Sequence, residues 1–199
     1  MKRILLPASE ADIRDLRIGD EVLVSGVMIT ARDAAHKYLV ENNDKDAEKI
    51  LKGSMIYHCG PVVTRENGVY RFVSAGPTTS AREEPYEAAV IERYGVRGII
   101  GKGGMGKDTL AALGKFGAVY LHAVGGLAVL LAKSVTEVVG VMKLEEFGVP
   151  EAMWIIKVSD FPALVTMDSH GGNLHEKVFK SSRERLLDLA RKMENAAGA

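Results

Sequence analysis

The chain has 199 residues, with 26 Lys and Arg against 26 Asp and Glu, and a single cysteine, Cys59. Its length suits one domain or two small ones, each with a real core. The charge balance argues against a general nucleic-acid binder, and one cysteine excludes an internal disulfide or a metal site built from several thiolates. We expect a cytoplasmic protein with no membrane segment, because the apolar runs at 1–7 and 118–132 are too short for a signal peptide or a spanning helix.

Strand-like and helix-like patterns alternate along the chain, which predicts a single α/β domain over residues 1–199. In chain order the expected elements are a strand at 21–30, a helix at 33–41, strands at 54–59 and 70–74, a helix at 84–94, a strand at 96–100, a helix at 107–115, a strand at 118–123, a helix at 126–136, one or two strands at 152–166 interrupted at Pro162, and an amphipathic helix at 174–197. The last helix has three open roles: covering its own core, docking on a partner, or docking on a second copy.

A glycine-rich loop, GKGGMGKD, begins at Gly101 and fits two phosphate-binding patterns. The dinucleotide pattern lacks the acidic residue expected about 20 positions later. The nucleoside-triphosphate pattern has Asp108 where a hydroxyl should hold magnesium. Nucleotide binding through Gly101 to Lys107 is therefore a distant alternative to a simple glycine turn before a helix, with Lys102 in solvent.

Two earlier loops also carry cations after a strand. In ITARDAAH, Arg32 precedes a helix and His36 lies one turn later on the same face. A plain structural interpretation pairs Arg32 with Asp33 or Asp12 at the surface and buries His36 in the core.

In SAGPTTSAR, the Gly76-Pro77 pair predicts a tight turn, after which Thr78 offers a hydroxyl and Arg82 a positive charge at the start of a helix. Such a helix start binds carboxylates or phosphates, although a hydroxyl cap followed by a solvated arginine explains it equally well.

Together the three loops place Arg32, Arg82 and Lys102 beside strand ends in a chain of zero net charge. A small substrate with two carboxylates needs about that many donors. The sequence therefore favours a small-anion site.

Four segments occur in an order shared with class I iron–sulfur hydro-lyases: ITARDAAH, YHCGPVV, SAGPTTSAR and IIGKGGMG. From about residue 10 to about residue 173, including the stretch MWIIKVSDFPALVTMDSHG, the sequence resembles the C-terminal domain of class I fumarases. It equally resembles the separate β subunit of two-subunit fumarases and L-tartrate dehydratases.

The resemblance implies a swivelling β/β/α fold, with a mixed sheet core and flanking helices. It also implies a hetero-oligomer in which an α subunit, not this chain, binds a [4Fe–4S] cluster through three cysteines. The implied reaction is the reversible hydration of fumarate to (S)-malate, with L(+)-tartrate dehydration as the alternative. A non-enzymatic module that senses dicarboxylates is a further hypothesis.

Residue roles follow from the same resemblance. Thr78 matches the catalytic base, and Arg32, Arg82 and Lys102 match the residues that bind the substrate carboxylates. The remaining matches are supporting residues: His36, Gly76, Pro77, Gly101, Gly103 and Gly104. A threonine hydroxyl is a poor base by itself, so we expect the α subunit to supply the group that assists Thr78.

No metal site is expected in this chain. Cys59 lies in a strand-like run and is interpreted as a small buried residue. The other histidines share no metal-ligand spacing: His58, His122, His170 and His175.

Overall fold

A mixed sheet with helices around it is formed by residues 1–197, the part that this computed structural model describes. The elements are β1 (Lys2–Leu5), α1 (Glu10–Arg14), β2 (Glu21–Thr30), α2 (Asp33–Glu41), α3 (Lys45–Leu51), β3 (Met55–Tyr57), β4 (Val62–Glu66), β5 (Val69–Ser74), a 3₁₀ turn η1 (Ser80–Arg82), α4 (Glu84–Tyr94), β6 (Gly98–Gly101), α5 (Lys107–Phe116), β7 (Val119–His122), α6 (Ala128–Lys133), β8 (Val135–Met142), α7 (Leu144–Phe147), β9 (Met153–Met167) and α8 (Leu174–Ala197). None of these described helices has the length and apolarity needed to cross a membrane.

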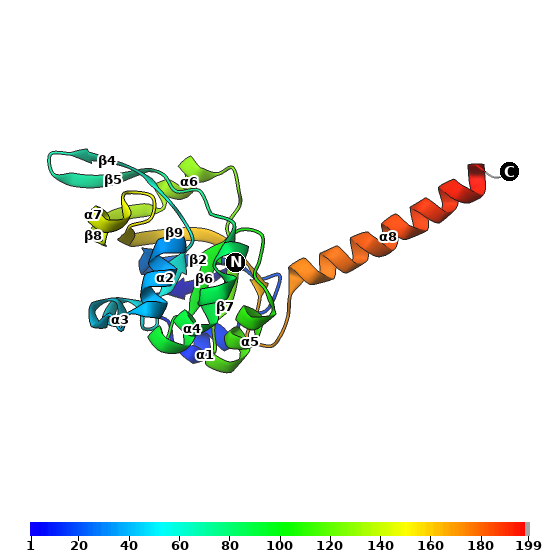
Figure 1. Ribbon diagram of the computed structural model, residues 1–199, viewed down its shortest axis with the longest axis horizontal. Coiled ribbons are helices and arrows are strands. Elements are labelled where there is room, and N and C mark those ends of the chain that lie inside the picture. Colours follow the sequence, from blue (N-terminus) through cyan, green and yellow to red (C-terminus); the bar gives the residue numbers. More distant parts are fainter. Residues whose placement is uncertain (198–199) are drawn as a thin grey trace.

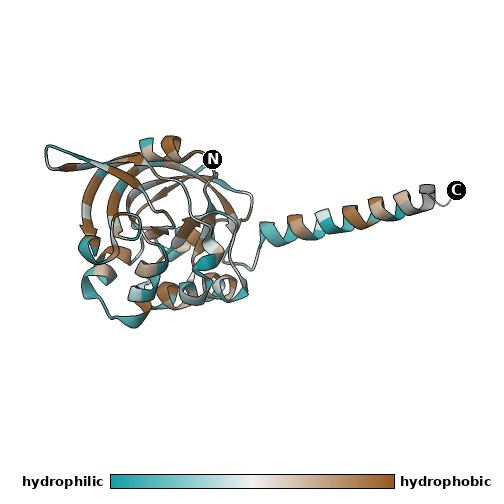
Figure 2. Cartoon of the chain, turned by 45° about the horizontal axis from the view of Figure 1, so that its top comes forward, coloured by the Kyte–Doolittle hydropathy of each residue, from teal (hydrophilic) through white to brown (hydrophobic). Residues whose placement is uncertain are grey.

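The seven-stranded sheet has the order β1-β2-β3-β6-β7-β9-β8. Strands β1, β2, β3, β6 and β7 pair in parallel, whereas β9 runs antiparallel to its neighbours. The long strand β9 pairs with β7 and also with β2, from Glu21 to Ile29. This double pairing closes β2, β3, β6, β7 and β9 into a ring, and the strands curve accordingly in Figure 2.

Two apolar cores follow from the alternation of side chains along the strands. In β3, Met55 and Tyr57 point into the interior of the ring, where they meet Trp154, and Ile56 points the other way. Ile56 joins the second core, which lies between the sheet and the helices α2, α4 and α5. Because both faces of β3, β6 and β7 are buried, these strands read as continuous apolar runs.

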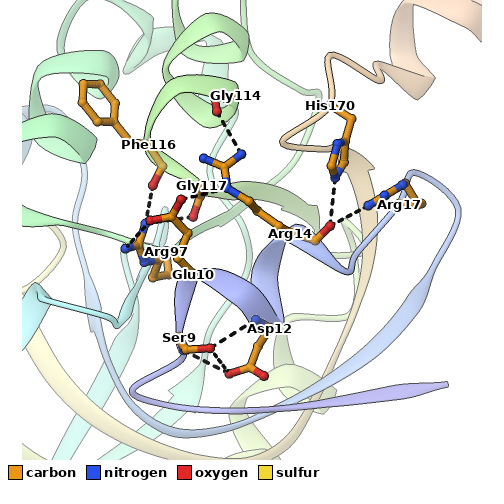
Figure 3. Close-up of polar contacts among 10 residues, drawn as sticks. All are labelled: Ser9, Glu10, Asp12, Arg14, Arg17, Arg97, Gly114, Phe116, Gly117 and His170. Carbon is orange, nitrogen blue, oxygen red and sulfur yellow. Dashed lines mark hydrogen bonds and ion pairs between the residues drawn. The ribbon is translucent and has the colours of Figure 1, made fainter.

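The C-terminal end of α5 is tied down by side chains from α1 and from the segment before β6 (Figure 3). Arg14 donates to the carbonyl of Gly114 at 3.1 Å, and Arg97 donates to that of Gly117 at 3.0 Å. Glu10 accepts from Arg14 at 2.8 Å and lies 3.3 Å from Arg97. These bonds satisfy carbonyls left free at the C-terminal end of α5. The glycine loop therefore leads into a helix whose far end is fixed.

The expected fold class, a mixed sheet with flanking helices, is confirmed. The bounds predicted for β2, α2, α4 and α8 are also confirmed. Pro162 does not interrupt β9, since it lies within the register opposite Leu23. The helix expected at 126–136 ends at Lys133, and the β-branched residues after it begin β8.

Two elements project from the body in Figure 1: the β4–β5 hairpin at one end and α8 at the other. The apolar side chains of α8 are exposed: Val178, Phe179, Leu186, Leu187, Leu189 and Met193. Among the roles considered for this helix, covering its own core is therefore wrong.

Candidate functional site

The parallel strands β2, β3, β6 and β7 all end at the same edge of the sheet, because parallel neighbours share a direction. Arg32 follows the end of β2, His58 the end of β3, and Lys102 the end of β6. Three loops that lie far apart in the sequence are thereby brought to one edge.

The segment that carries Thr78 is held by backbone hydrogen bonds to two of these loops. The Thr78 N–H donates to the carbonyl of His58 at 2.7 Å, and the Lys102 N–H donates to the carbonyl of Thr78 at 3.3 Å. The Ser80 N–H returns a bond to the carbonyl of Lys102 at 3.0 Å. The predicted base and the predicted carboxylate binder Lys102 are therefore neighbours.

Arg32 lies beside the same turn. Its guanidinium packs so closely on Gly60 that a Cβ there would lie 2.6 Å from Nη1, and Cys59 pairs with Pro77 immediately before Thr78. The Arg32 Nε lies 3.3 Å from a carboxylate oxygen of Glu151.

Arg82 forms an ion pair with Asp33 at the start of α2, which places it next to Arg32. The pairing considered from the sequence, Arg32 with Asp33 or Asp12, is therefore wrong. Asp12 instead forms a capping box with Ser9 at the start of α1 (Figure 3). Lys102 has no ion pair with any residue in the described part of the chain.

Steric contacts explain why glycine occupies several of the predicted supporting positions. A Cβ on Gly101 would lie 1.9 Å from the Ser80 hydroxyl, so only glycine fits there. Gly76 lies against α6, where a Cβ would come within 3.1 Å of the Ala128 side chain. Gly103 and Gly104 both have positive φ, +86° and +77°.

Behind these loops lies a continuous chain of buried polar groups that the sequence analysis did not connect. We call the side chains of His36, His58, Ser80, Glu87 and Tyr120 the buried polar chain; all five are fully buried. Glu87 lies 3.2 Å from Nε2 of His36 and 3.0 Å from Nε2 of His58. A signal existed in the sequence: Glu87 lies one helical turn before the apolar Ile91 in the helix expected at 84–94.

The charges of Glu87 and His36 in the buried polar chain are strongly coupled. Burial opposes charge on both Glu87 and His36, but each stabilises the ionised form of the other. The pKa of Glu87 is accordingly lowered to about 2, and the pKa of His36 is raised to about 9. Burial lowers the pKa of His58, so this imidazole is neutral. Glu83 is buried too, and its pKa is raised to about 7 by burial.

His36, His58 and Glu87 offer ligand atoms within 4.8 Å of one another, as a metal site would. Contacts among the three side chains already account for that geometry: Glu87 accepts from Nε2 of His58 at 3.0 Å and forms an ion pair with Nε2 of His36 at 3.2 Å. The protonated state of His36 also disfavours a metal ion.

The chain does not fit an iron–sulfur cluster. Its one cysteine, Cys59, is 1% exposed, and burial raises the pKa of its thiol to about 12. Cluster binding requires several thiolates.

The helix start after the glycine loop is already occupied. The carboxylate of Glu84 accepts from the N–H groups of Gly106 at 2.7 Å and of Asp108 and Thr109 at 3.2 Å each. A nucleotide phosphate would need these same donors, and a second anion beside Glu84 would be repelled. This contact argues against the nucleotide alternative.

These features define an α/β domain that gathers cations and hydroxyl groups at the carboxyl ends of its parallel strands. The family model described as fumarase C-terminus matches residues 1–178. The chain therefore belongs to the fumarase C-terminus family.

Individual relatives agree with this family. A protein of Geobacillus stearothermophilus, provisionally named fumarate hydratase class I, is 52% identical over 181 residues, which cover 90% of this chain and 34% of that protein. The chain thus spans about a third of the length of that relative. The L(+)-tartrate dehydratase subunit beta of Escherichia coli strain K12 is 38% identical over 94% of this chain and 95% of its own length. A Methanocaldococcus jannaschii protein, provisionally given the same subunit name, is 43% identical over 91% of this chain and 94% of its length.

Proposed function

We propose that this chain is the β subunit of a [4Fe–4S]-dependent hydro-lyase that reversibly hydrates fumarate to (S)-malate together with an α subunit. The observation that carries the proposal is the convergence of Arg32, Arg82 and Lys102 on the backbone-bonded segment of Thr78. The β subunit of an L(+)-tartrate dehydratase is the second candidate, favoured by relatives of that name that match this chain over nearly their full length. We also propose a cytoplasmic location, because the single cysteine is a free, buried thiol, as is usual in a reducing compartment.

The cluster belongs to the α subunit in this proposal, because the chain lacks the thiolates to bind it. The role of this chain is to bind the two carboxylates of the substrate and to handle one proton. Arg32 and Lys102 supply positive charge from the two loops next to the Thr78 segment, and Arg82 adds a third cation from η1. Such fixed cations stabilise the negative charge that grows on a carboxylate when the neighbouring carbon loses its proton.

Thr78 is assigned the proton transfer. In the dehydration direction its Oγ1 accepts the proton from the carbon beside the carboxylate, and the C–H electrons form the C=C bond as the C–O bond breaks. The departing hydroxyl takes up one proton, relayed from Thr78 through the α subunit, and leaves as water. The hydroxyl of Thr78 must pass its own proton on, and no described residue of this chain forms a hydrogen bond with it. We therefore assign that acceptor to the α subunit.

The surroundings of Lys102 fit a site that a second subunit completes. Val124 and Leu127, in the loop after β7, are 54% and 41% exposed, and Leu130 on α6 is 52% exposed. A Cβ on Gly125 would lie 3.7 Å from the Lys102 side chain, so this apolar surface borders the cations. A subunit covering it would exclude water and strengthen the charge interactions in the site.

The test is an anaerobic assay of the chain purified together with an α-subunit protein that carries the three cluster cysteines. We expect turnover of fumarate and malate by the pair, and none by either chain alone. Thr78→Ala should lower kcat by about 10²–10⁴-fold with assembly intact, as loss of a positioned acid–base group does. The matched control is Thr136→Ala, which removes an exposed threonine on β8.

Several outcomes would contradict the proposal. Turnover by this chain alone would refute the division between subunits, and full activity of the Thr78→Ala pair would refute the assigned base. Loss of activity in that variant would count against the dicarboxylate-sensing module. A parallel assay with L(+)-tartrate decides between the two substrates.

A further inference from the structure

Four of the five members of the buried polar chain have no assigned role in the proposed reaction, and the path links β7, η1, α4 and α2 behind the predicted site. It runs from Tyr120 on β7 through Ser80 and His58 to Glu87 on α4, and then to His36 on α2. Five fully buried polar side chains in one connected path are costly to desolvate, and they are stable only when each finds its partner.

At its Tyr120 end, the buried polar chain sets the position of the Thr78 segment. The Tyr120 hydroxyl donates to Ser80 Oγ at 2.8 Å, and Ser80 Oγ lies 2.9 Å from Nδ1 of His58. Because burial keeps His58 neutral, the Ser80 hydroxyl donates to Nδ1, and the proton on Nε2 points to Glu87. Ser80 is also bonded through its N–H to Lys102, so its hydroxyl fixes both predicted site loops.

At its His36 end, the buried polar chain reaches the first turn of α2. His36 lies 3.2 Å from Glu87 through Nε2, and through Nδ1 it donates to the carbonyl of Arg32 at 2.9 Å. Arg32 is the residue that caps α2 and carries a predicted carboxylate-binding guanidinium. The imidazole therefore holds the backbone of Arg32 against α4.

Glu87 is the carboxylate of this path that lies against both imidazoles: it accepts a hydrogen bond from Nε2 of His58 and forms an ion pair with Nε2 of His36. Glu83, the residue just before α4, lies 3.9 Å from His36, and Asp33 and Arg82 pair with each other nearby. Losing the charge of Glu87 would leave His36 with a weaker partner in a medium where unpaired charge is expensive.

We propose that Glu87 is a positioning residue of the anion site: through His36 and His58 its carboxylate holds the turn that carries Arg32 in register with the segments of Thr78 and Lys102. This inference rests on the proposed hydro-lyase function. It assigns a role in geometry, not a contact with substrate.

The test compares Glu87→Gln with Glu92→Gln in the full-length chain, each purified with the α subunit. Glu92 lies on the same helix but is 59% exposed, and among the described residues it pairs only with Lys115, at 3.4 Å. We expect Glu87→Gln to lower kcat/KM by about 10–100-fold, the usual cost of removing a group that orients a binding residue. Glu92→Gln should stay within about 2-fold of the wild type.

A readout beyond activity separates positioning from loss of folded protein. Misplacing Arg32 relative to Lys102 raises KM as well as lowering kcat, whereas partial unfolding lowers only the number of active sites and leaves KM unchanged. Nitrogen NMR of the histidines in this chain alone reports the network directly. In the wild type His36 should stay protonated to about pH 9, and in Glu87→Gln its pKa should fall by about one unit or more.

The inference is overturned if Glu87→Gln has wild-type kcat and KM while its His36 titration has shifted. Should that variant fail to fold, Ser80→Ala carries the test, and an unchanged KM in Ser80→Ala overturns the inference as well. An inactive wild-type complex is a different result, since it refutes the proposed function itself and the positioning role with it.

Discussion

Two glutamates one helical turn apart, Glu83 just before α4 and Glu87 within it, differ in how readily they ionise. Glu87 contacts two imidazoles and is held ionised, whereas neither oxygen of Glu83 has a hydrogen-bond partner among the described residues. The pKa of Glu83 is raised to about 7, because burial disfavours its charge and Asp33 and Glu87 add repulsion that His36 only partly offsets. The difference lies in the partners, since both side chains are equally buried.

Glu83 should therefore lower the stability of the protein at high pH. The folded protein holds the carboxyl proton of Glu83 more tightly than the unfolded protein does. The loss of stability therefore begins as pH rises above 4.5 and is complete above about pH 7. A shift from 4.5 to about 7 corresponds to roughly 3 kcal/mol. We expect Glu83→Gln to raise the free energy of unfolding by about 1–3 kcal/mol at about pH 8, with little change at about pH 5.

Urea denaturation of the two proteins at both pH values measures this difference. Glu92→Gln, an exposed substitution on the same helix, serves as the control. A stability difference that does not vary with pH would show that Glu83 is ionised without penalty.

Gly101 is a second residue whose surroundings decide its identity. The Ser80 hydroxyl occupies the place of a Cβ, at 1.9 Å, and the Tyr120 hydroxyl lies 3.1 Å from it. Gly101→Ala should destabilise the fold by about 2–4 kcal/mol through overpacking and through displacing buried hydroxyls. Gly114→Ala on α5 is the matched control, because its Cβ would meet only the Ser169 carbonyl at 3.6 Å and alanine favours a helix. Thermal melts that rank the two variants equally would contradict this reason for Gly101.

At the scale of elements, α8 stands apart from the rest of the fold (Figure 1). Its described contacts with the body lie near its start, where Nε2 of His175 is 3.0 Å from the hydroxyl of Thr166. Farther along, α8 is exposed, and hydrophobic and hydrophilic residues follow one another along its length (Figure 2). The stability of this helix on the isolated chain is limited, because an unpacked helix has only its own hydrogen bonds and side-chain pairs.

Deleting residues 180–199 should leave the melting temperature within about 2 °C of the wild type, since none of the described side chains in the deleted part is buried. Leu39→Ala, on α2, provides the contrast: it removes a fully buried side chain and should cost about 2–5 kcal/mol. Calorimetry of the three proteins measures both effects. A drop of many degrees on deletion would mean that α8 packs on the body in solution.

At the scale of the whole molecule, the closed ring of strands places the functional loops at one edge. Strand β9 is essential to this arrangement, because it pairs with both β2 and β7 and so brings the two ends of the parallel layer together. The charges of the site are then supplied by loops, while the cluster chemistry of the proposed reaction has no ligands here.

The isolated chain should consequently remain colourless and free of stoichiometric iron after anaerobic reconstitution with iron and sulfide. One buried thiol with a raised pKa cannot replace the several thiolates that a cluster needs. Visible absorption and iron analysis measure this, and the complex with the α subunit is the positive control. Stoichiometric iron in the chain alone would contradict the assignment of the cluster to the partner.

Local patterns in the sequence were sufficient for several elements and for the family. The periodicity of β2, α2, α4 and α8 predicted their bounds, because each has a regular apolar spacing or clear flanking breakers. Short or polar elements such as β1 and α3 were missed, since a few residues carry little periodic signal. The roles assigned to Thr78 and the three cations remain predictions.

The sequence by itself determined that the chain cannot hold a cluster, and it indicated which three loops carry the cations. Only the tertiary structure decided how the charges pair: Arg32 with Glu151, Arg82 with Asp33, and Glu87 with two buried imidazoles. The physical reason is that pairing and burial depend on which distant segments the sheet brings together. The spacing of residues along the chain contains no direct record of those distances.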